Sequence, residues 1–420
     1  MRAHKRILFV AEAVTLAHLA RPLALAQALD DSRYESILAC APRYATLIGD
    51  RAPPLREIYS ISNEQFLERL ARGRPVYDIE TLRRYARDDL ALIDEVRPDL
   101  IVGDFRLSLS VSARVAGIPY MAITNAYWSP YVRQRIPLPE HPSSRILGLS
   151  GAEAVFRVVH PLAFALHCIP LNRLRREYGL PSLGSSLFRV YTDADITLYA
   201  DVPEAIPVEN CPAHHVYLGP VLWSPPVPLP VWWSSLPRDR PLVYVCLGSS
   251  GRRQLLGSVL ESLSAVACTV AAATAGQPLP SKVPSNVNIS TYLPGDAVIP
   301  RASLVICNGG SPTSQQALAA GVPVLGLASN LDQFLNMAAV ERLGAGRLLR
   351  AERATSMAIR EAATTILGQP GYAAAAHEAA RIFGRYQAHD RFASMVAAIL
   401  GTARSAVVPT APEFTCTPAE

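Results

Sequence analysis

Short apolar runs recur along the chain, and each is followed by a turn and a segment with helical spacing. Residues 6–11, residues 304–307 and the run that ends at Gly103-Asp104 are of this kind, and uniformly apolar runs of this length are typical of buried parallel strands. Residues 389–400 have helical spacing and predict a final helix. Alternating strands and helices predict an α/β protein with doubly wound parallel sheets.

A proline-dense segment, residues 219–241, interrupts this alternation and contains three of the four tryptophans. Such a segment is extended and semi-rigid, so we interpret it as an interdomain linker. It separates a first Rossmann-like domain, residues 1–218, from a second, residues 242–388, and a length of 420 residues suits two domains. We expect residues 401–420, after the final helix, to be a disordered tail.

Composition restricts the class of protein further. Half of the residues are apolar and 18% are charged, which excludes a disordered chain, and a dispersed net charge of +5 does not indicate nucleic-acid binding. The seven cysteines show no CxxC spacing and are interpreted as reduced thiols of a cytoplasmic protein. The apolar stretch before Glu12 is too short for a signal peptide, so residues 6–11 are interpreted as the first strand. Because no uncharged apolar run reaches 18 residues, we expect no membrane span.

The turn after residues 304–307 has the features of an anion site. Gly309 and Gly310 allow a tight turn in which backbone N–H groups approach a phosphate. A helix is expected to begin near Ser311, where its positive end and the hydroxyls of Ser311 and Thr313 favour a phosphate group. Two glycines before a helix also close ordinary strand-to-helix turns, so the turn alone does not decide the function.

Polar residues follow this turn at fixed offsets: Asn308, Thr313, Gln316, Gly321–Pro323, Asp332 and Gln333. This order resembles the donor-binding motif of the family 1 glycosyltransferases, the UDP-glycosyltransferase-like enzymes. In that family the first position is usually a His that contacts the diphosphate, the third is a Glu that holds the ribose, and the final pair binds the sugar hydroxyls. Asn308 and Gln316 keep hydrogen-bonding groups but lose the ionisable ones, which leaves donor affinity and nucleotide choice open.

Two further segments carry the same resemblance. Tyr292 and Leu293 fall in the loop where a family aromatic stacks on the base, and Ser249 and Ser250 fall in a turn near the diphosphate. An ordinary core aromatic and an ordinary turn are the alternatives. The resemblance implies the GT-B fold, with two Rossmann-like domains facing across a cleft, a last helix that returns to the first domain, and no metal or cofactor. We accordingly interpret the Asp-x-Asp sequence at residues 193–195 as chance.

Two residues of the first domain are candidates for catalysis. His18 lies between the first strand and a helix that contains Pro22, and the resemblance implies that it is the general base. Asp104 ends a strand, where ligands of open α/β sheets collect, and the resemblance makes it the partner of His18. A surface histidine and a helix-capping aspartate are the alternatives.

The acceptor side is less defined. The loop after residue 125 contains Tyr127, Trp128 and Arg133, which suit a flat apolar acceptor or an ordinary solvated loop. Residues 154–180 are apolar and then basic, which is consistent with a membrane-surface element, with the wall of an acceptor pocket or with a core helix that ends in cations.

The resemblance implies an inverting transferase that moves a hexose or deoxyhexose from a UDP- or dTDP-sugar to a hydrophobic small molecule. A peripheral contact with a membrane would accompany a lipid acceptor. The alternatives are transfer to a membrane lipid, a non-catalytic GT-B partner protein and a sugar-nucleotide epimerase.

Overall fold

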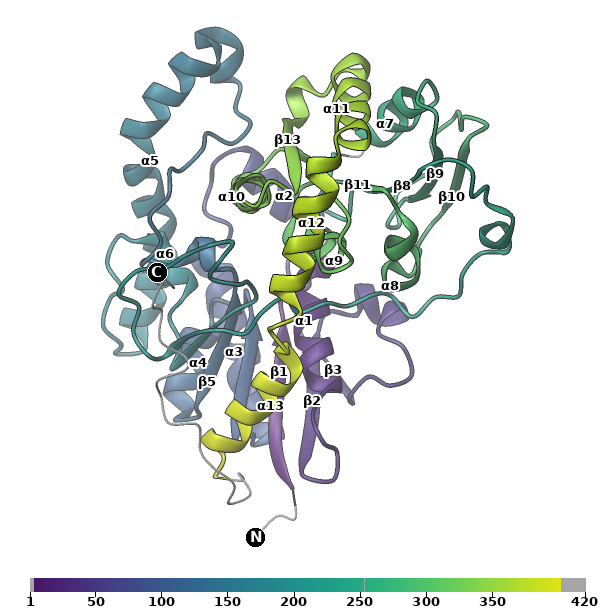
Figure 1. Ribbon diagram of the computed structural model, residues 1–420. Helices are drawn as coiled ribbons and strands as arrows, with labels where there is room; N and C mark the ends of the chain where they lie inside the picture. Colours follow the sequence, from purple (N-terminus) through teal and green to yellow (C-terminus); the bar gives the residue numbers. More distant parts are fainter. Residues whose placement is uncertain (1–3, 253, 402–420) are drawn as a thin grey trace. The chain divides into compact units, whose positions relative to one another are not determined.

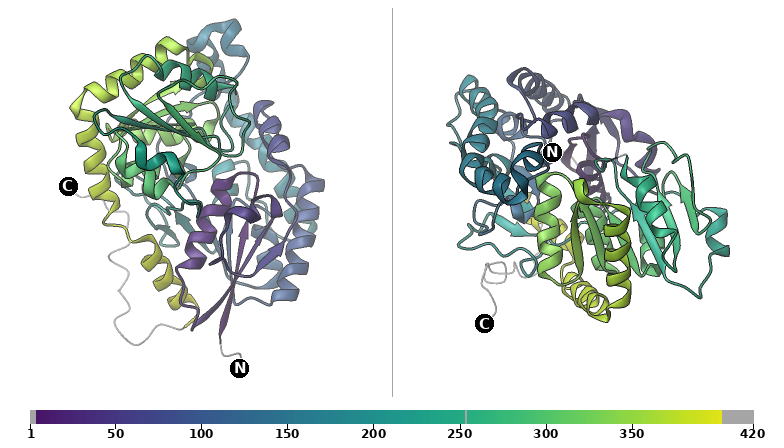
Figure 2. Two further views of the ribbon diagram at one scale, coloured as in Figure 1. Left: turned by 90° about the vertical axis from the view of Figure 1, so that its right-hand side faces the viewer. Right: turned by 90° about the horizontal axis from the view of Figure 1, so that it is seen from above.

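Two parallel sheets with flanking helices form the framework of the chain, as Figures 1 and 2 show. The computed structural model describes residues 4–252 and 254–401. Contacts divide it into two units, which we describe separately: the first lies within residues 1–134, 157–221 and 386–420, and the second within 135–156 and 222–385.

The first unit contains a seven-stranded parallel sheet in the order β3-β2-β1-β4-β5-β6-β7. Its strands are β1 (Lys5–Ala11), β2 (Tyr34–Cys40), β3 (Leu55–Glu57), β4 (Leu100–Asp104), β5 (Tyr120–Thr124), β6 (Ile196–Tyr199) and β7 (His215–Tyr217). Its helices are α1 (Leu16–Gln27), α2 (Asn63–Ala71), α3 (Ile79–Val96), α4 (Leu109–Ala116), η2 (Ala126–Trp128), most of α5 (Ser143–Glu177), α6 (Leu187–Tyr191) and α13 (Ala388–Ile399). The direction of strand order reverses between β1 and β4, where such sheets bind ligands.

The second unit contains a six-stranded parallel sheet in the order β10-β9-β8-β11-β12-β13. Its strands are β8 (Leu242–Cys246), β9 (Thr269–Ala273), β10 (Val287–Ser290), β11 (Leu304–Cys307), β12 (Val324–Ala328) and β13 (Gly346–Arg350). Its helices are α7 (Leu255–Leu263), α8 (Gly295–Val298), α9 (Ser311–Ala319), α10 (Leu331–Arg342), α11 (Ser356–Gly368) and α12 (Pro370–Phe383). Strand order reverses between β8 and β11.

The apolar runs form strands because they are buried on both faces. All residues of β4, β5, β11 and β12 are buried, as expected for the inner strands of a parallel sheet covered by helices. The predicted strand at residues 304–307, the helix start at Ser311 and the doubly wound parallel architecture are confirmed.

The last helix, α13, packs against α1 of the first unit, and the ring centroids of Phe392 and Phe9 lie 6.0 Å apart.

The proline-dense segment, residues 219–241, is irregular apart from one short turn of 3-10 helix, Val231–Ser235. The predicted tail lies outside the described residues except for Gly401. None of the six cysteines within the described ranges forms a disulfide.

One segment departs from the division drawn at residue 218. Residues 135–156 cluster with the second unit, since Arg350 Nη1 donates to the Leu138 carbonyl at 2.9 Å and the Glu140 N–H donates to the Ser329 carbonyl at 2.9 Å. These are long-range contacts, and the local sequence gives no sign of them.

Helix α5 bears on the expectation of no membrane span, which stays a prediction. Residues Ile146–Glu177 are long and apolar enough to cross a membrane by length and composition only, and 11% of the most apolar 18-residue stretch is buried. The core-helix interpretation of residues 154–180 applies to one side of the helix, where Cys168, Leu171 and Leu174 are buried in a core cluster. The helix bends at Gly148, whose φ is +67°.

Candidate functional site

His18 and Asp104 meet where the strand order of the first sheet reverses. His18 lies in the first turn of α1, directly after β1, and Asp104 is the last residue of β4. The Nδ1 atom of His18 lies 2.7 Å from Oδ1 of Asp104. Asp104 is fully buried, whereas the His18 side chain is 19% exposed, so the imidazole remains accessible. A carboxylate on Nδ1 fixes the tautomer in which Nε2 has the lone pair that a general base needs.

Arg21, one turn further along α1, shares the same carboxylate. Its Nε donates to Oδ2 of Asp104 at 2.7 Å, and its Nη2 donates to Oδ1 at 2.8 Å. Its Nη1 donates to Asn125 Oδ1 at 2.8 Å. Burial acts to lower the pKa of Arg21, but the Asp104 carboxylate and smaller contributions from Tyr127 and Asp201 raise it overall. Our sequence interpretation missed Arg21, although its position three residues after His18 places it on the same helix face.

An aromatic wall extends from His18 across the first unit. Phe105 stacks on the imidazole with ring centroids 4.7 Å apart, and its φ of +59° is uncommon for a residue other than glycine. Tyr191 packs on Phe105 at 5.4 Å, and Trp128 packs on Tyr191 at 4.9 Å. These side chains are only partly buried, so the wall offers an apolar surface next to the base.

A buried ion cluster holds the residue after Phe105. Arg106 is fully buried and contacts the carboxylates of Glu12 at 3.1 Å and Asp89 at 3.0 Å. Burial raises the pKa of both carboxyls, although Arg106 acts to lower it. The cluster fixes the backbone on both sides of the His18 site, since Glu12 follows β1 and Arg106 follows β4.

The three predicted acceptor residues, Tyr127, Trp128 and Arg133, lie in different surroundings. Trp128 belongs to the aromatic wall, but the Tyr127 side chain is 1% exposed and is part of the core. Arg133 is an exposed residue whose Nε pairs with Glu209 at 2.9 Å.

In the second unit, the predicted diphosphate residues lie at the reversal between β8 and β11. Asn308 follows β11, and its Nδ2 donates to Ser250 Oγ in the turn after β8 at 3.0 Å. Its Oδ1 accepts the Gly310 N–H at 3.1 Å. Asn308 therefore joins the two turns through its side chain. Ser249 and Ser250 are half-buried in the first of these turns.

The glycine turn has the expected geometry at the start of α9. Gly309 has φ +80°, and a Cβ there would lie 2.8 Å from Met337 Cγ. Gly310 is the N-cap of α9 and has no side chain to cap it, while Ser311 and Thr313 occupy the first turn. Asn336, which sequence interpretation missed, donates to the Gly309 carbonyl at 2.8 Å and so fixes the turn to α10.

The remaining donor candidates differ in their surroundings. Tyr292 is half-buried, and burial raises the pKa of its hydroxyl, whereas Leu293 is 2% exposed and lies in the core. Gln316 uses its Nε2 to donate to the Trp223 carbonyl and to Ser224 Oγ.

Gln333 is a structural residue with one unused donor. Its Oε1 accepts the Ser329 N–H at 2.8 Å, and its own N–H donates to Asn330 in a capping box at the start of α10. Its Nε2 is buried and has no hydrogen-bond partner among the described residues. A buried donor without a partner costs about 1–3 kcal/mol, which a ligand acceptor would relieve. Asp332 lies half-buried beside it.

Within the described ranges, no group of three or more His, Cys, Asp or Glu side chains could hold a metal ion. The Asp-x-Asp sequence has structural partners: Asp193 pairs with Arg114 at 2.9 Å and Arg175 at 2.7 Å, and Asp195 accepts the Tyr120 N–H.

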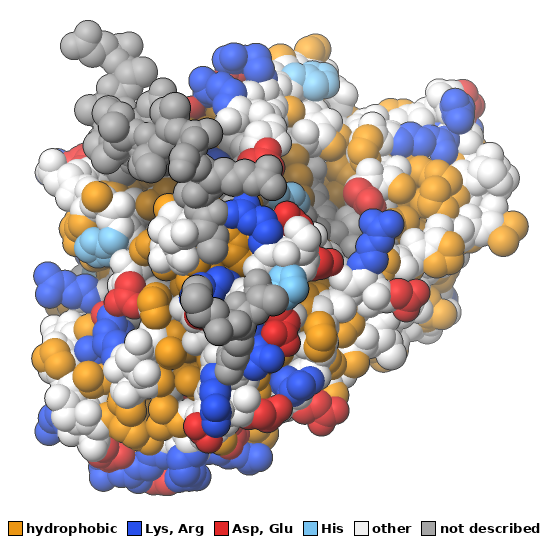
Figure 3. Space-filling view, turned by 90° about the horizontal axis from the view of Figure 1, so that it is seen from below, with side chains coloured by type: hydrophobic (Ala, Val, Ile, Leu, Met, Phe, Trp, Pro, Cys, Tyr) orange, Lys and Arg blue, Asp and Glu red, His pale blue; other side chains and the backbone are white. Residues whose placement is uncertain are grey.

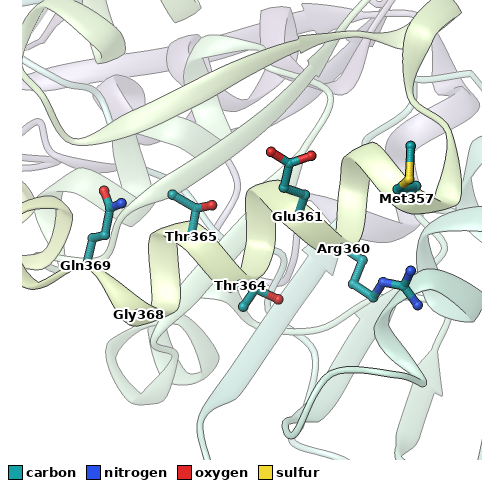
Figure 4. A pocket seen from close by; sticks show the side chains of 7 residues that line it. All are labelled: Met357, Arg360, Glu361, Thr364, Thr365, Gly368 and Gln369. Atoms are coloured by element: carbon teal, nitrogen blue, oxygen red, sulfur yellow. The ribbon is translucent and has the colours of Figure 1, made fainter.

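A depression along α11 contains none of the candidate residues. Its lining side chains come from α11 and the following residue and point to different sides, Glu361 to one and Arg360 to the other (Figure 4).

Comparisons with known proteins agree with this geometry. Residues 256–382 match the family described as "Erythromycin biosynthesis protein CIII-like, C-terminal domain". A "PGL/p-HBAD biosynthesis glycosyltransferase" of Mycobacterium tuberculosis is 53% identical over 380 residues, 90% of this chain and 89% of that protein. A "PGL/p-HBAD biosynthesis rhamnosyltransferase" of Mycobacterium bovis is 55% identical over 381 residues, 91% and 85% of the two chains.

Solved structures share the fold. The spinosyn rhamnosyltransferase SpnG has a TM-score of 0.68 at 21% identity, with 95% of this chain and 100% of that chain covered. SpnG has also been solved with thymidine diphosphate and with spinosyn aglycone. The fold is therefore GT-B, and the chain belongs to the family 1 glycosyltransferases.

Proposed function

We propose that this glycosyltransferase moves a deoxyhexose from a dTDP-sugar to a hydroxyl of an apolar small molecule, with inversion at the anomeric carbon and with His18 as the general base. The contact between His18 Nδ1 and Asp104 at the strand-order reversal of the first sheet is the observation that carries the proposal.

The proposed reaction is a single displacement. His18 Nε2 accepts the proton of the acceptor hydroxyl while that oxygen bonds to C1 of the sugar. The bond between C1 and the diphosphate oxygen breaks, and the nucleoside diphosphate leaves with the electron pair. Asp104 stabilises the imidazolium that forms, and the base contributes about 10²–10⁴-fold to the rate.

The leaving diphosphate requires stabilisation of its negative charge. The N-terminus of α9 supplies backbone N–H groups and a positive dipole end, and Gly309 and Gly310 let the phosphates approach them. Asn308 and Ser250 extend this set with neutral donors. We propose that the reaction uses no metal or other cofactor, which predicts full turnover after EDTA treatment and dialysis.

Several observations favour a dTDP-deoxyhexose over a UDP-hexose. The Mycobacterium bovis relative is named a rhamnosyltransferase, and SpnG, also named one, has been solved with thymidine diphosphate. Gln316, in place of the usual ribose-binding carboxylate, presents a neutral carbonyl oxygen to the ribose. Asp332 and the unused Nε2 of Gln333 are the proposed contacts of the sugar hydroxyls.

The acceptor is proposed to be an aromatic or otherwise apolar compound with a free hydroxyl. The wall of Phe105, Tyr191 and Trp128 beside His18 supports this, as do the names of the mycobacterial relatives, which refer to PGL/p-HBAD biosynthesis. We propose a reducing, cytoplasmic location, which the lack of disulfides among the described cysteines supports.

The donor is tested by calorimetric titration with dTDP-rhamnose, UDP-glucose, dTDP and UDP. We expect dTDP-rhamnose to bind most tightly, and Asp332→Ala to weaken the sugar nucleotide more than the bare nucleotide. Equal or tighter binding of UDP-glucose would overturn the donor assignment.

The stereochemistry of transfer is tested by NMR of the glycoside formed with a phenolic acceptor, where a retained anomeric configuration would contradict single displacement.

A further inference from the structure

Helix α5 exposes a stripe of large apolar side chains in its first-unit part, residues 157–177. The exposed fractions are 79% for Val158, 48% for Val159, 64% for Leu162, 50% for Leu166 and 54% for Ile169. With about 100° between successive helical residues, these five lie within an arc of about 100°. Soluble monomers rarely expose contiguous apolar surface of this kind, so the stripe indicates a binding surface.

The stripe ends in positive charge. Arg173 and Arg176 follow Ile169 by four and seven residues, on the same arc, and both are exposed. Arg173 has one ion-pair contact, with Glu177 at 3.5 Å, and Arg176 has none among the described residues. On the face drawn in Figure 3, acidic and basic side chains intermingle. Apolar residues bordered by arginine are the pattern of helices that lie in the interface of an anionic membrane.

The opposite side of α5 is covered by protein. Cys168, Leu171 and Leu174 are at most 1% exposed and belong to a core cluster of the first unit. A helix that crosses a bilayer independently would present all of its sides to lipid, whereas this one has a packed side and an open side. The length and composition of α5 therefore suit a helix that lies on a membrane rather than one that spans it.

The packed side of α5 also reaches the aromatic wall. Phe164 lies 5.9 Å from Phe188, and Phe188 lies 6.0 Å from Trp128, which is part of the wall beside His18. One helix thus contacts the proposed acceptor surface with one side and exposes an apolar stripe on the other.

We propose that the stripe of α5 docks on an anionic lipid surface, so that the enzyme takes apolar acceptors at the membrane. Docking goes beyond the proposed function and requires neither donor nor turnover. Its failure can therefore be told apart from failure of the proposed reaction.

The test is cosedimentation of the full chain with vesicles of phosphatidylcholine, alone and with added phosphatidylglycerol. We expect binding that strengthens with phosphatidylglycerol and weakens with salt. Leu162→Asp removes an apolar side chain from the contact and should weaken binding about 10-fold or more. Arg176→Gln should weaken binding about five-fold on the anionic vesicles alone.

Matched controls are available in the second unit. Val231→Asp changes a valine that is 95% exposed, and Arg238→Gln changes an exposed arginine; neither should alter vesicle binding. Circular dichroism and thermal unfolding report whether each variant is folded. Absence of vesicle binding by the unaltered protein would overturn the proposal, as would equal binding by Leu162→Asp. If the unaltered protein binds no vesicles but forms a dimer that Leu162→Asp dissociates, the stripe is a contact with a second copy, and the proposal is overturned as well.

Discussion

Among single residues, Arg21 changes how the His18–Asp104 pair can work. In a simple histidine–carboxylate pair the full negative charge stabilises the imidazolium. Here Asp104 also accepts two N–H groups from Arg21, and Arg21 Nη2 lies 3.5 Å from the His18 ring nitrogen. Arg21 therefore holds the Asp104 carboxylate in place against Nδ1 of His18.

His18→Ala should reduce kcat by about 10²–10⁴-fold, because the substitution removes the proposed proton acceptor. Binding of the nucleotide-sugar should change little, since the donor residues lie in the second unit. Steady-state rates and calorimetry measure the two effects. His4→Ala, at an exposed position before β1, is the control, and wild-type turnover by His18→Ala would show that another group is the base.

Arg21→Gln should lower kcat with little change in donor binding, because Asp104 loses the two N–H groups that hold it against His18. Arg21→Lys keeps the charge but not the bidentate contact, so it should lower kcat as well. Steady-state rates and calorimetry measure the two effects. The exposed Arg51→Gln serves as a control. An unchanged kcat in Arg21→Gln would show that Asp104 does not need Arg21 to orient His18.

Single residues also show what the sequence allows one to predict. His18 and Asp104 could be named as candidates because His18 follows an apolar strand and Asp104 ends one, each within a local pattern. Arg21 and Phe105 were missed because their importance depends on contacts between segments about 85 residues apart, as in the Arg21 bond to Asp104. The local sequence does not specify such contacts.

Among elements, the turn between β11 and α9 depends most on one backbone conformation. Gly309→Ala should weaken donor binding and destabilise the protein by about 1–3 kcal/mol, because φ is +80° and the new Cβ would lie 2.8 Å from Met337 Cγ. Gly73→Ala is a matched control, since φ is +60° there but a Cβ would meet nothing within 4 Å. Calorimetry and thermal unfolding measure both variants. Equal effects of the two variants on donor affinity would contradict a specific role of the turn.

Elements differ in how well the sequence predicts them. Strand β11 and helix α9 were placed correctly because a fully apolar run, two glycines and a polar helix start all indicate the same structure. Helix α5 was found as an apolar segment, and its exposure was one of several interpretations left open. Both a core helix and an interfacial helix have apolar residues followed by arginine, and only the packing of Cys168 and Leu171 on one side distinguishes them.

For the whole molecule, the positions of the candidate residues follow from topology. Each sheet reverses its strand order once, between β1 and β4 in the first unit and between β8 and β11 in the second. His18 and Asp104 lie at the first reversal, and Ser250 and Asn308 lie at the second. The carboxyl ends of the strands on the two sides of a reversal leave room for a ligand because their connections run in opposite directions. The apolar runs predicted the parallel sheets, but the assignment of residues 135–156 to the second unit depends on long-range contacts such as that of Arg350 with Leu138.

The stability of the whole protein should decrease with acidification through His215 in β7. Burial, with a smaller contribution from His214, lowers the pKa of His215 from 6.5 to about 4, and its Nδ1 lies 2.6 Å from the Tyr199 hydroxyl. The unfolded chain therefore binds this proton first as the pH falls, so the free energy of unfolding should drop between about pH 6.5 and 4 by up to about 3 kcal/mol. His215→Gln cannot take up this proton and should show a shallower drop, even if it is less stable at pH 7. Urea unfolding at a series of pH values measures both curves, and parallel curves would show that other groups cause the loss.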